Sequence, residues 1–172
     1  MSVVRSVDFA ASQIVYLSAL EPYKVTVTPR FASAVLGGLA NRLIYQPAIN
    51  KSLSGNQLSL PAQVSGGPRQ YFDNGLALHS RTEMIYRIDE GEYGRLQGLA
   101  GIDPDLRQQG SVRLVIQGDD KSLLDTGIGP GDSPVPIDVN VEGVRRLIIL
   151  VDYGDTLDAG DHLNLCEIRL TP

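Results

Sequence analysis

The sequence predicts an all-β fold, an antiparallel β-sandwich or jelly roll formed by residues 1–172 as a single domain. Short segments in which apolar and polar residues alternate recur along the chain, and this is the period of a strand with one buried face. Turn-forming residues separate these segments, and the chain contains 18 glycines and 10 prolines among 172 residues. Helical periodicity is scarce, so many short strands joined by turns favour a sandwich.

The clearest strands lie after residue 110. Residues 111–117 alternate, residues 118–121 form a hairpin-like turn, and residues 122–128 resume extended structure. Residues 135–141 place their apolar side chains on one face. Residues 145–152 have an unbroken apolar middle, which predicts a central strand covered on both faces.

Further strands are expected on either side of this region. Residues 76–79, 83–88 and 95–102 are strand-like, and residues 162–170 alternate with a shift near Cys166.

The first third of the chain is less regular. Residues 12–17 and 24–28 are strand-like, and residues 31–43 form the best helical candidate, weakened by paired glycines. Residues 47–71, rich in Ser, Gly, Gln and Pro, predict long connections.

Composition excludes several classes of protein. The net charge of −5 argues against a sequence-independent nucleic-acid binder, which needs a basic face. No apolar run reaches the roughly 18 residues of a membrane span. One cysteine excludes an intramolecular disulfide, and with two histidines the chain has too few ligands for a typical structural zinc site.

The residues predict that the chain is not an enzyme. The G-x-S-x-G motif of serine hydrolases is absent, and the neighbours His79 and Ser80 on one strand point to opposite faces. Two facing carboxylates would suit a glycosidase, but 20 acidic residues make such a pair easy to propose and therefore uninformative.

Aspartates recur at every third position near the end of the chain, at residues 152, 155, 158 and 161. Carboxylates in a glycine-containing loop are typical calcium ligands, and Asp155, Asp158 and Asp161 are the candidates here. The alternative is an exposed turn, in which aspartate suits the backbone, and the residues alone favour the turn.

Polar side chains of several kinds gather around two predicted strand ends. If both ends lie on one rim of the sandwich, their side chains converge and could bind the hydroxyl groups of a sugar, each of which donates and accepts hydrogen bonds. These candidates are His79, Arg81, Glu83, Asp161, His162 and Asn164. Alternatively, the two histidines are buried structural groups, and residue statistics favour that alternative.

A series of motifs runs in order within residues 70–171, at residues 75–86, 98–103, 110–116, 118–120, 124–127, 135–147, 151–155 and 160–162. Together these motifs resemble the NPCBM domain, the novel putative carbohydrate-binding module associated with family 98 glycosidases and similar to carbohydrate-binding module family 51. The opening of the chain resembles domains of planctomycete-type bacterial proteins.

The resemblance implies a galactose-binding-domain-like jelly roll that binds terminal galactose or related glycans and holds a structural calcium ion. His79 stands at the histidine of the family's G-x-x-x-H-[SA] motif, and Asp161 and His162 stand at its G-D-H turn. Family members commonly place Trp three residues after that second histidine, where this chain has Leu165 and contains no tryptophan at all.

These observations predict a non-catalytic, lectin-like carbohydrate-binding module with weak affinity for galactose-type glycans. The alternative is a structural or protein-interaction β-sandwich that has lost the sugar site. The first residues lack a signal-peptide pattern, so a cytoplasmic chain is the default expectation. A longer precursor with a signal peptide would be exported, and the chain could belong to a larger multi-domain protein.

Overall fold

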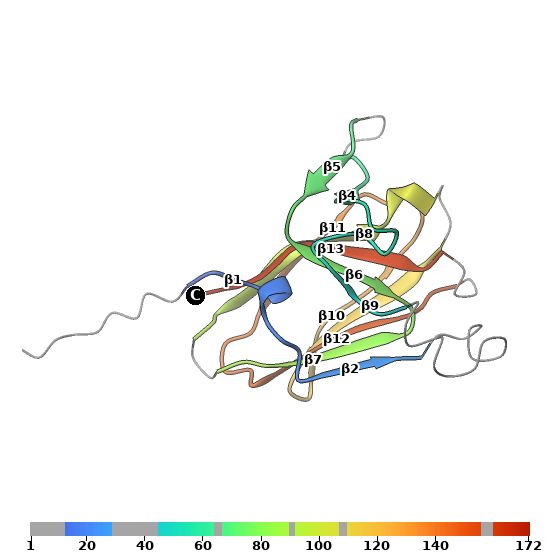
Figure 1. Cartoon of the computed structure of the whole chain (residues 1–172). Helices are drawn as coiled ribbons and strands as arrows, with labels where there is room; N and C mark the ends of the chain where they lie inside the picture. The colour runs from blue at the N-terminus through green and yellow to red at the C-terminus, as the bar shows by residue number, and fades with distance from the viewer. Residues whose placement is uncertain (1–12, 29–44, 64–66, 90–91, 107–109, 156–159) are drawn as a thin grey trace, which may run out of the picture.

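The computed structural model describes residues 13–28, 45–63, 67–89, 92–106, 110–155 and 160–172, and in these parts strands dominate (Figure 1). Two antiparallel sheets pack against each other, and a small hairpin covers the outer face of one of them. The fold is the antiparallel β-sandwich that the sequence predicts.

The first sheet has the strand order β11-β8-β13-β6-β3, and β1 pairs with β13 at one end. Its strands are β1 (Val15–Tyr16), β3 (Ala48–Ile49), β6 (Gly75–His79), β8 (Arg95–Ile102), β11 (Val135–Asn140) and β13 (His162–Thr171).

The second sheet has the strand order β10-β9-β12-β7-β2. Its strands are β2 (Lys24–Val27), β7 (Thr82–Arg87), β9 (Val112–Gly118), β10 (Lys121–Ile128) and β12 (Arg146–Tyr153).

The remaining elements are short. β4 (Leu58–Leu60) and β5 (Gln70–Phe72) form a separate hairpin above the first sheet (Figure 1). The 3₁₀ helices are η1 (Leu17–Ala19) and η2 (Pro104–Leu106). Neither of these helices, the two found in the described parts of the chain, is long and apolar enough to cross a membrane.

Apolar and polar side chains alternate along the strands, and the apolar side chains form the main core between the two sheets. Each strand contributes every second side chain, as Met84 and Tyr86 do from β7, and both are almost completely buried. A second, smaller apolar cluster lies on the other side of the first sheet, where Leu58 and Leu60 of the hairpin pack against Ala77 and Cys166. The first sheet is therefore covered on both faces over part of its area.

Two local predictions are confirmed in detail. The turn between β9 and β10 places Asp119 at a φ of 52°, as a tight hairpin turn requires. The shift expected near Cys166 is a β-bulge, because the pairing of β13 with β8 changes register between Cys166 and Arg169 and Glu167 has a φ of 53°.

Three predictions need correction, and a fourth cannot be compared. Residues 47–71 are not only connections, since β3, β4 and β5 lie there or overlap them. The extended part of residues 12–17 is limited to β1, and η1 follows at once. β12 is central in its sheet, but alternate residues on its outer face are only half-buried. The helical candidate at residues 31–43 lies outside the described residues.

Candidate functional site

Several of the predicted binding residues lie on the outer face of the first sheet. On β6 and β13, leucines such as Leu78 and Leu163 point into the core between the sheets. Because side chains alternate along a strand, His79 of β6 and His162 and Asn164 of β13 point to the opposite, outer face.

The two histidines and Tyr45 form a ring cluster on this face. His79 and His162 are direct partners in the pairing of β6 with β13, and their ring centroids lie 5.5 Å apart in an edge-to-face arrangement. The ring of Tyr45 packs 4.3 Å from that of His79. The His79 Nδ1–H donates to the carbonyl oxygen of Ser80, so the ring of His79 is held in place on both sides. His79 is 3% exposed, whereas His162 and Tyr45 are half-buried and can contact a ligand.

Asp103 lies on the other side of His162. It directly follows β8, and its backbone N–H donates to the carbonyl oxygen of His162 at 2.9 Å. The side chain is 1% exposed, and its Oδ1 accepts a hydrogen bond from the Asp105 backbone N–H at 3.0 Å. Burial raises the pKa of Asp103, against the smaller opposing effect of that hydrogen bond.

Three side-chain atoms on this face are buried without a hydrogen-bond partner among the described residues. They are the Asp103 Oδ2, the His162 Nδ1 and the Asn164 Oδ1. A buried polar atom left unpaired costs about 1–3 kcal/mol, so natural proteins rarely keep three on one face unless water or a ligand satisfies them. A hydroxyl group both donates and accepts, so a hydroxyl-rich ligand suits the atoms of Asp103 and His162, whereas Asn164 is completely buried.

A hollow of about 270 Å³ opens beside Asp103. Pro61, Pro104 and Pro130 line it together with Arg69, whose guanidinium binds the Asp105 carboxylate at 2.5 Å and the Pro104 carbonyl oxygen at 3.0 Å. These contacts fix the wall of the hollow. Its volume lies at the small end of ligand pockets and suits one small polar molecule rather than a long one.

Asp161 holds the two strand ends together behind this face. Its Oδ2 accepts a hydrogen bond from the Ser80 hydroxyl at 2.6 Å, and its Oδ1 accepts one from the Ser111 backbone N–H at 2.9 Å. The side chain is completely buried. Asp161 therefore positions His162, its neighbour in the chain, and its oxygens are engaged by the protein.

Asn164 is also held by the protein. Its side-chain amide donates to the carbonyl oxygen of Ser59 on β4 at 3.0 Å, and Asn164 is completely buried beneath the hairpin. Only its unpartnered oxygen is left for a further contact.

Of the other two predicted binding residues, Glu83 lies on β7 of the second sheet and Arg81 directly precedes that strand. Thr82 and Met84 point into the core, so Glu83 between them points to the outer face of the second sheet. Arg81 pairs with Asp152 at 3.6 Å. The structure thus brings His79 and His162 together, with Asp161 behind them and Asn164 beside them, but it does not bring Arg81 and Glu83 to this face.

The candidate calcium ligands do not form a set among the described residues. Asp155 is exposed, and its backbone N–H donates to the Ser111 hydroxyl at 3.0 Å. Asp161 binds Ser80 and Ser111, and Asp158 lies outside the described residues. In the parts of the chain that the structure describes, no three His, Cys, Asp or Glu residues lie close enough to hold a metal ion. The described residues alone therefore do not fit the six to eight oxygens that calcium requires.

Leu165 lies where the resemblance places a tryptophan, and it is completely buried in the core between the sheets. A side chain at this position points away from the outer face, so in this chain it cannot form a stacking surface for a sugar. The missing tryptophan therefore changes core packing and does not by itself remove the candidate site.

The pH dependence of His162 tests its burial. Desolvation, and to a lesser extent the nearby His79, lower the pKa of His162 to about 4. A histidine in the unfolded chain titrates near pH 6.5, so between about pH 6.5 and pH 4 the unfolded state binds more protons. His162 should therefore reduce the free energy of unfolding progressively as the pH falls through this window, with no loss above it.

NMR titration of the imidazole carbons, with urea unfolding at pH 7 and pH 5, measures both effects. The free energy of unfolding of the His162→Gln variant should lack the part of the pH dependence that is due to His162. A midpoint for His162 near pH 6.5 would contradict the buried, neutral imidazole.

The sequence does not single out Asp103 and Tyr45. Asp103 could have been found from its place at the end of the segment 98–103, one of the motifs that carries the family resemblance. Tyr45 lies outside any periodic segment, so no sequence signal connects it with His79.

Comparison with known proteins identifies the family. The model of the NPCBM/NEW2 domain matches residues 16–171. No curated protein matches the chain.

Several solved structures that share this fold are CBM51 modules. The CBM51 of Clostridium perfringens GH95, in complex with methyl-galactose, superimposes with a TM-score of 0.77 at 19% identity, over 92% of this chain and 100% of that one. The CBM51-2 and INT domains of Clostridium perfringens ZmpB, with GlcNAc, give 0.76 at 20% identity, over 92% of this chain and 31% of that one. The tandem CBM51 modules of Sp3GH98 from Streptococcus pneumoniae SP3-BS71 superimpose with a TM-score of 0.72 at 16% identity, over 92% of this chain and 47% of that one.

The family match covers most of the chain, and the neighbours share its two-sheet architecture. The protein belongs to the NPCBM/NEW2 domain family.

Proposed function

We propose that the chain is a non-catalytic module that binds a galactose-type sugar on the outer face of the first sheet, at Asp103 and the ring cluster of Tyr45, His79 and His162. The observation that carries the proposal is the presence on this face of unpartnered polar side-chain atoms of Asp103 and His162. Family membership and the methyl-galactose complex of a structural neighbour support the choice of ligand.

Each residue has a role that follows from its chemistry. The free oxygen of Asp103 accepts a hydrogen bond from a sugar hydroxyl, and the Nδ1 of His162 exchanges one with a second hydroxyl. The rings of Tyr45 and His162 offer apolar surface to the sugar ring. Asp161 does not touch the sugar and positions His162.

The affinity should be low. No tryptophan is present to stack on the sugar, and the small hollow beside Asp103 is not lined by the rings of Tyr45, His79 or His162, so the contacts are few. We expect a Kd of about 1 mM, which corresponds to roughly −4 kcal/mol.

The carboxylates near Asp103 support a non-catalytic role. Asp105 is its neighbour, and both oxygens of Asp105 are engaged, one by Arg69 and the other by the side-chain amide of Asn56 at 3.1 Å. The hydrogen bond from Arg69 lowers the pKa of Asp105, so this group is a poor general acid. Glycoside hydrolysis needs a second carboxyl group free to act as acid, base or nucleophile.

Isothermal titration with methyl-galactoside, N-acetylglucosamine and glucose tests the proposal. Asp103→Asn should weaken galactoside binding about tenfold or more, because the amide presents a donor where the sugar hydroxyl needs an acceptor. Asp138→Asn is the matched control, since Asp138 is an exposed carboxylate paired with Arg95 on β11 and β8, and it should bind as the parent does.

Equal heats from the Asp103→Asn variant and the parent would contradict the assigned site. No heat with any sugar at high protein concentration would favour the alternative function, a structural or protein-interaction module. Thermal melts of each variant confirm that the protein is folded.

We also propose the structural calcium ion that the resemblance implies, with Asp155 and Asp158 as its candidate ligands, whereas both oxygens of Asp161 are engaged by Ser80 and Ser111. Calcium should then raise the melting temperature, and a chelator should reverse the rise, because a ligand bound only to the folded state stabilises it. Asp158→Asn should abolish the shift. A melting temperature unchanged by calcium would contradict the proposal.

A further inference from the structure

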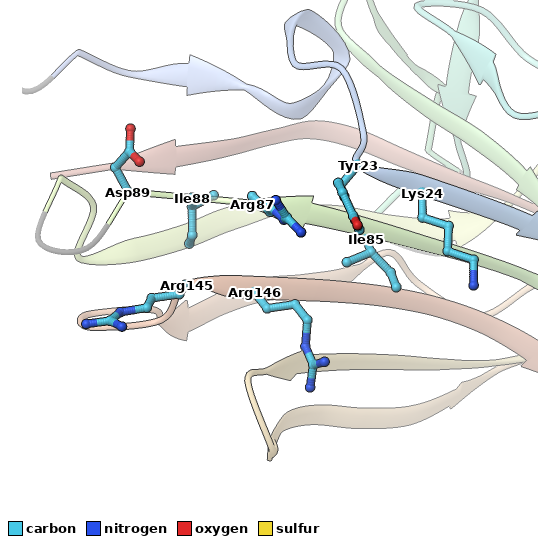
Figure 2. Close-up of a pocket in the computed structure, with 8 residues that line it drawn as sticks. All are labelled: Tyr23, Lys24, Ile85, Arg87, Ile88, Asp89, Arg145 and Arg146. Carbon is cyan, nitrogen blue, oxygen red and sulfur yellow. The ribbon is translucent and has the colours of Figure 1, made fainter.

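The outer face of the second sheet carries a basic depression that the sugar site does not use. It is an open hollow of about 720 Å³, on the side of the sandwich away from the first sheet (Figure 2). Four cationic residues line it, and the lining includes a single acid, Asp89. The cations are Lys24, Arg87, Arg145 and Arg146. In a chain of net charge −5, such a group of cations is a strong local departure from the average charge.

The arrangement of the cations places like charges side by side. Arg87 on β7 and Arg146 on β12 are direct partners across the sheet. Like charges directly opposite each other on neighbouring strands destabilise a sheet, and an anion bound between or above them would relieve this repulsion.

The protein itself neutralises these charges only in part. Neither Lys24 nor Arg87 forms an ion pair with any residue that the structure describes. Arg146 reaches Asp120 at 3.2 Å, but the Asp120 side chain is 97% exposed, and such surface pairs contribute little. In Figure 2, Lys24 and Arg146 extend to one side of the ribbon, while Asp89 points to the other.

A partly apolar platform lies among the charges. Tyr23 is 61% exposed, and the guanidinium of Arg87 lies 3.7 Å from the centre of its ring (Figure 2). Ile85, which is half-buried, lines the same hollow. The stacked pair presents a flat surface beside fixed positive charge, since a guanidinium over an aromatic ring is held by cation–π attraction.

We propose that this basic depression is a second binding site, for an acidic oligosaccharide that carries carboxylate or sulfate groups. The sugar rings pack on Tyr23 and Ile85, and the anionic groups bind Arg87, Arg146 and Lys24. A free inorganic anion would not use the apolar platform, and a neutral sugar would not use the cations. The site is independent of the galactose-type site on the first sheet.

Isothermal titration at low salt tests the proposal with three ligands: an oligogalacturonate, a sulfated oligosaccharide of the same length and a neutral galacto-oligosaccharide. At least one acidic ligand should bind, and binding should weaken as salt is raised, because exposed charges are screened. Comparison of the oligogalacturonate with the sulfated oligosaccharide shows whether the site recognises carboxylate or sulfate groups.

Variants locate the binding. Arg87→Gln should weaken it about tenfold, because it removes a charged donor and the partner of Tyr23 in one change. Tyr23→Ala should weaken it with the net charge unchanged. Lys51→Gln removes one positive charge from an exposed position outside the depression and should bind as the parent does. Asp103→Asn, which disrupts the galactose-type site, should leave acidic binding intact.

No binding of either acidic ligand would overturn the proposal, as would equal binding by Arg87→Gln and the parent. A poly-glutamate peptide that binds as tightly as the sugars would also overturn it, and would instead indicate a docking site for an acidic protein.

Discussion

Replacement of Asp161 with alanine is expected to lower the free energy of unfolding by about 3 kcal/mol. The carboxylate is completely buried and accepts hydrogen bonds from the Ser80 hydroxyl and the Ser111 backbone N–H. Hydrogen bonds to a charged group contribute about 1.5–3 kcal/mol each, and alanine removes the acceptor of both the buried Ser80 hydroxyl and the half-buried Ser111 N–H. For a chain of this size the melting temperature should fall by about 10 °C. Urea unfolding measures the free energy directly.

Ser80→Ala is the matched control, because it removes only one of the two hydrogen bonds. It should lower the free energy of unfolding by about half as much. An Asp161→Ala protein with the stability of the parent would show that Asp161 does not join the strand ends.

Substitution of Gly75 by alanine should destabilise the sandwich by about 3 kcal/mol or more. A Cβ atom at this position would lie 2.2 Å from the carbonyl oxygen of Leu165 and 2.9 Å from a methyl group of Leu58. The closest atom belongs to the backbone of β13, so β6 would have to move away from its partner strand. The glycine that opens the segment 75–79 is therefore required by the close approach of the two strands that carry His79 and His162.

Gly127→Ala is the control for this change. Gly127 also lies in a strand, β10, but a Cβ atom there would have no atom within 4 Å. The stability of the Gly127→Ala variant should therefore stay near that of the parent. Similar stabilities for the two variants would contradict the tight packing of β6 on β13.

The strands could be predicted where a periodic pattern reports a buried face. Residues 135–141 alternate because one side of β11 packs on the core, and the irregularity near Cys166 corresponds to a real bulge in β13. Strands of two or three residues, such as β3 and β4, are too short to show a period. They form because the outer face of the first sheet needs a cover, which is a tertiary requirement that a sequence window does not contain.

The site could be predicted only in part. His79 and His162 meet because β6 and β13 pair in register, and both lie in recognisable strands. Arg81 and Glu83 are close to His79 in the sequence. They do not lie with it on the outer face of the first sheet, because the chain crosses to the second sheet between β6 and β7. Asp103 resembles an ordinary turn aspartate in the sequence, and its significance comes from burial without a partner for one oxygen.

The central claim is that a sugar binds at Asp103 and the ring cluster on the outer face of the first sheet. Titration of ¹⁵N-labelled protein with methyl-galactoside, followed by amide chemical shifts, tests it most directly. The account predicts saturable shifts at Tyr45, His79, Asp103 and His162 and none around Tyr23 and Arg87. Shifts confined to the second sheet, or no shifts at all at a concentration of sugar well above 1 mM, would contradict it.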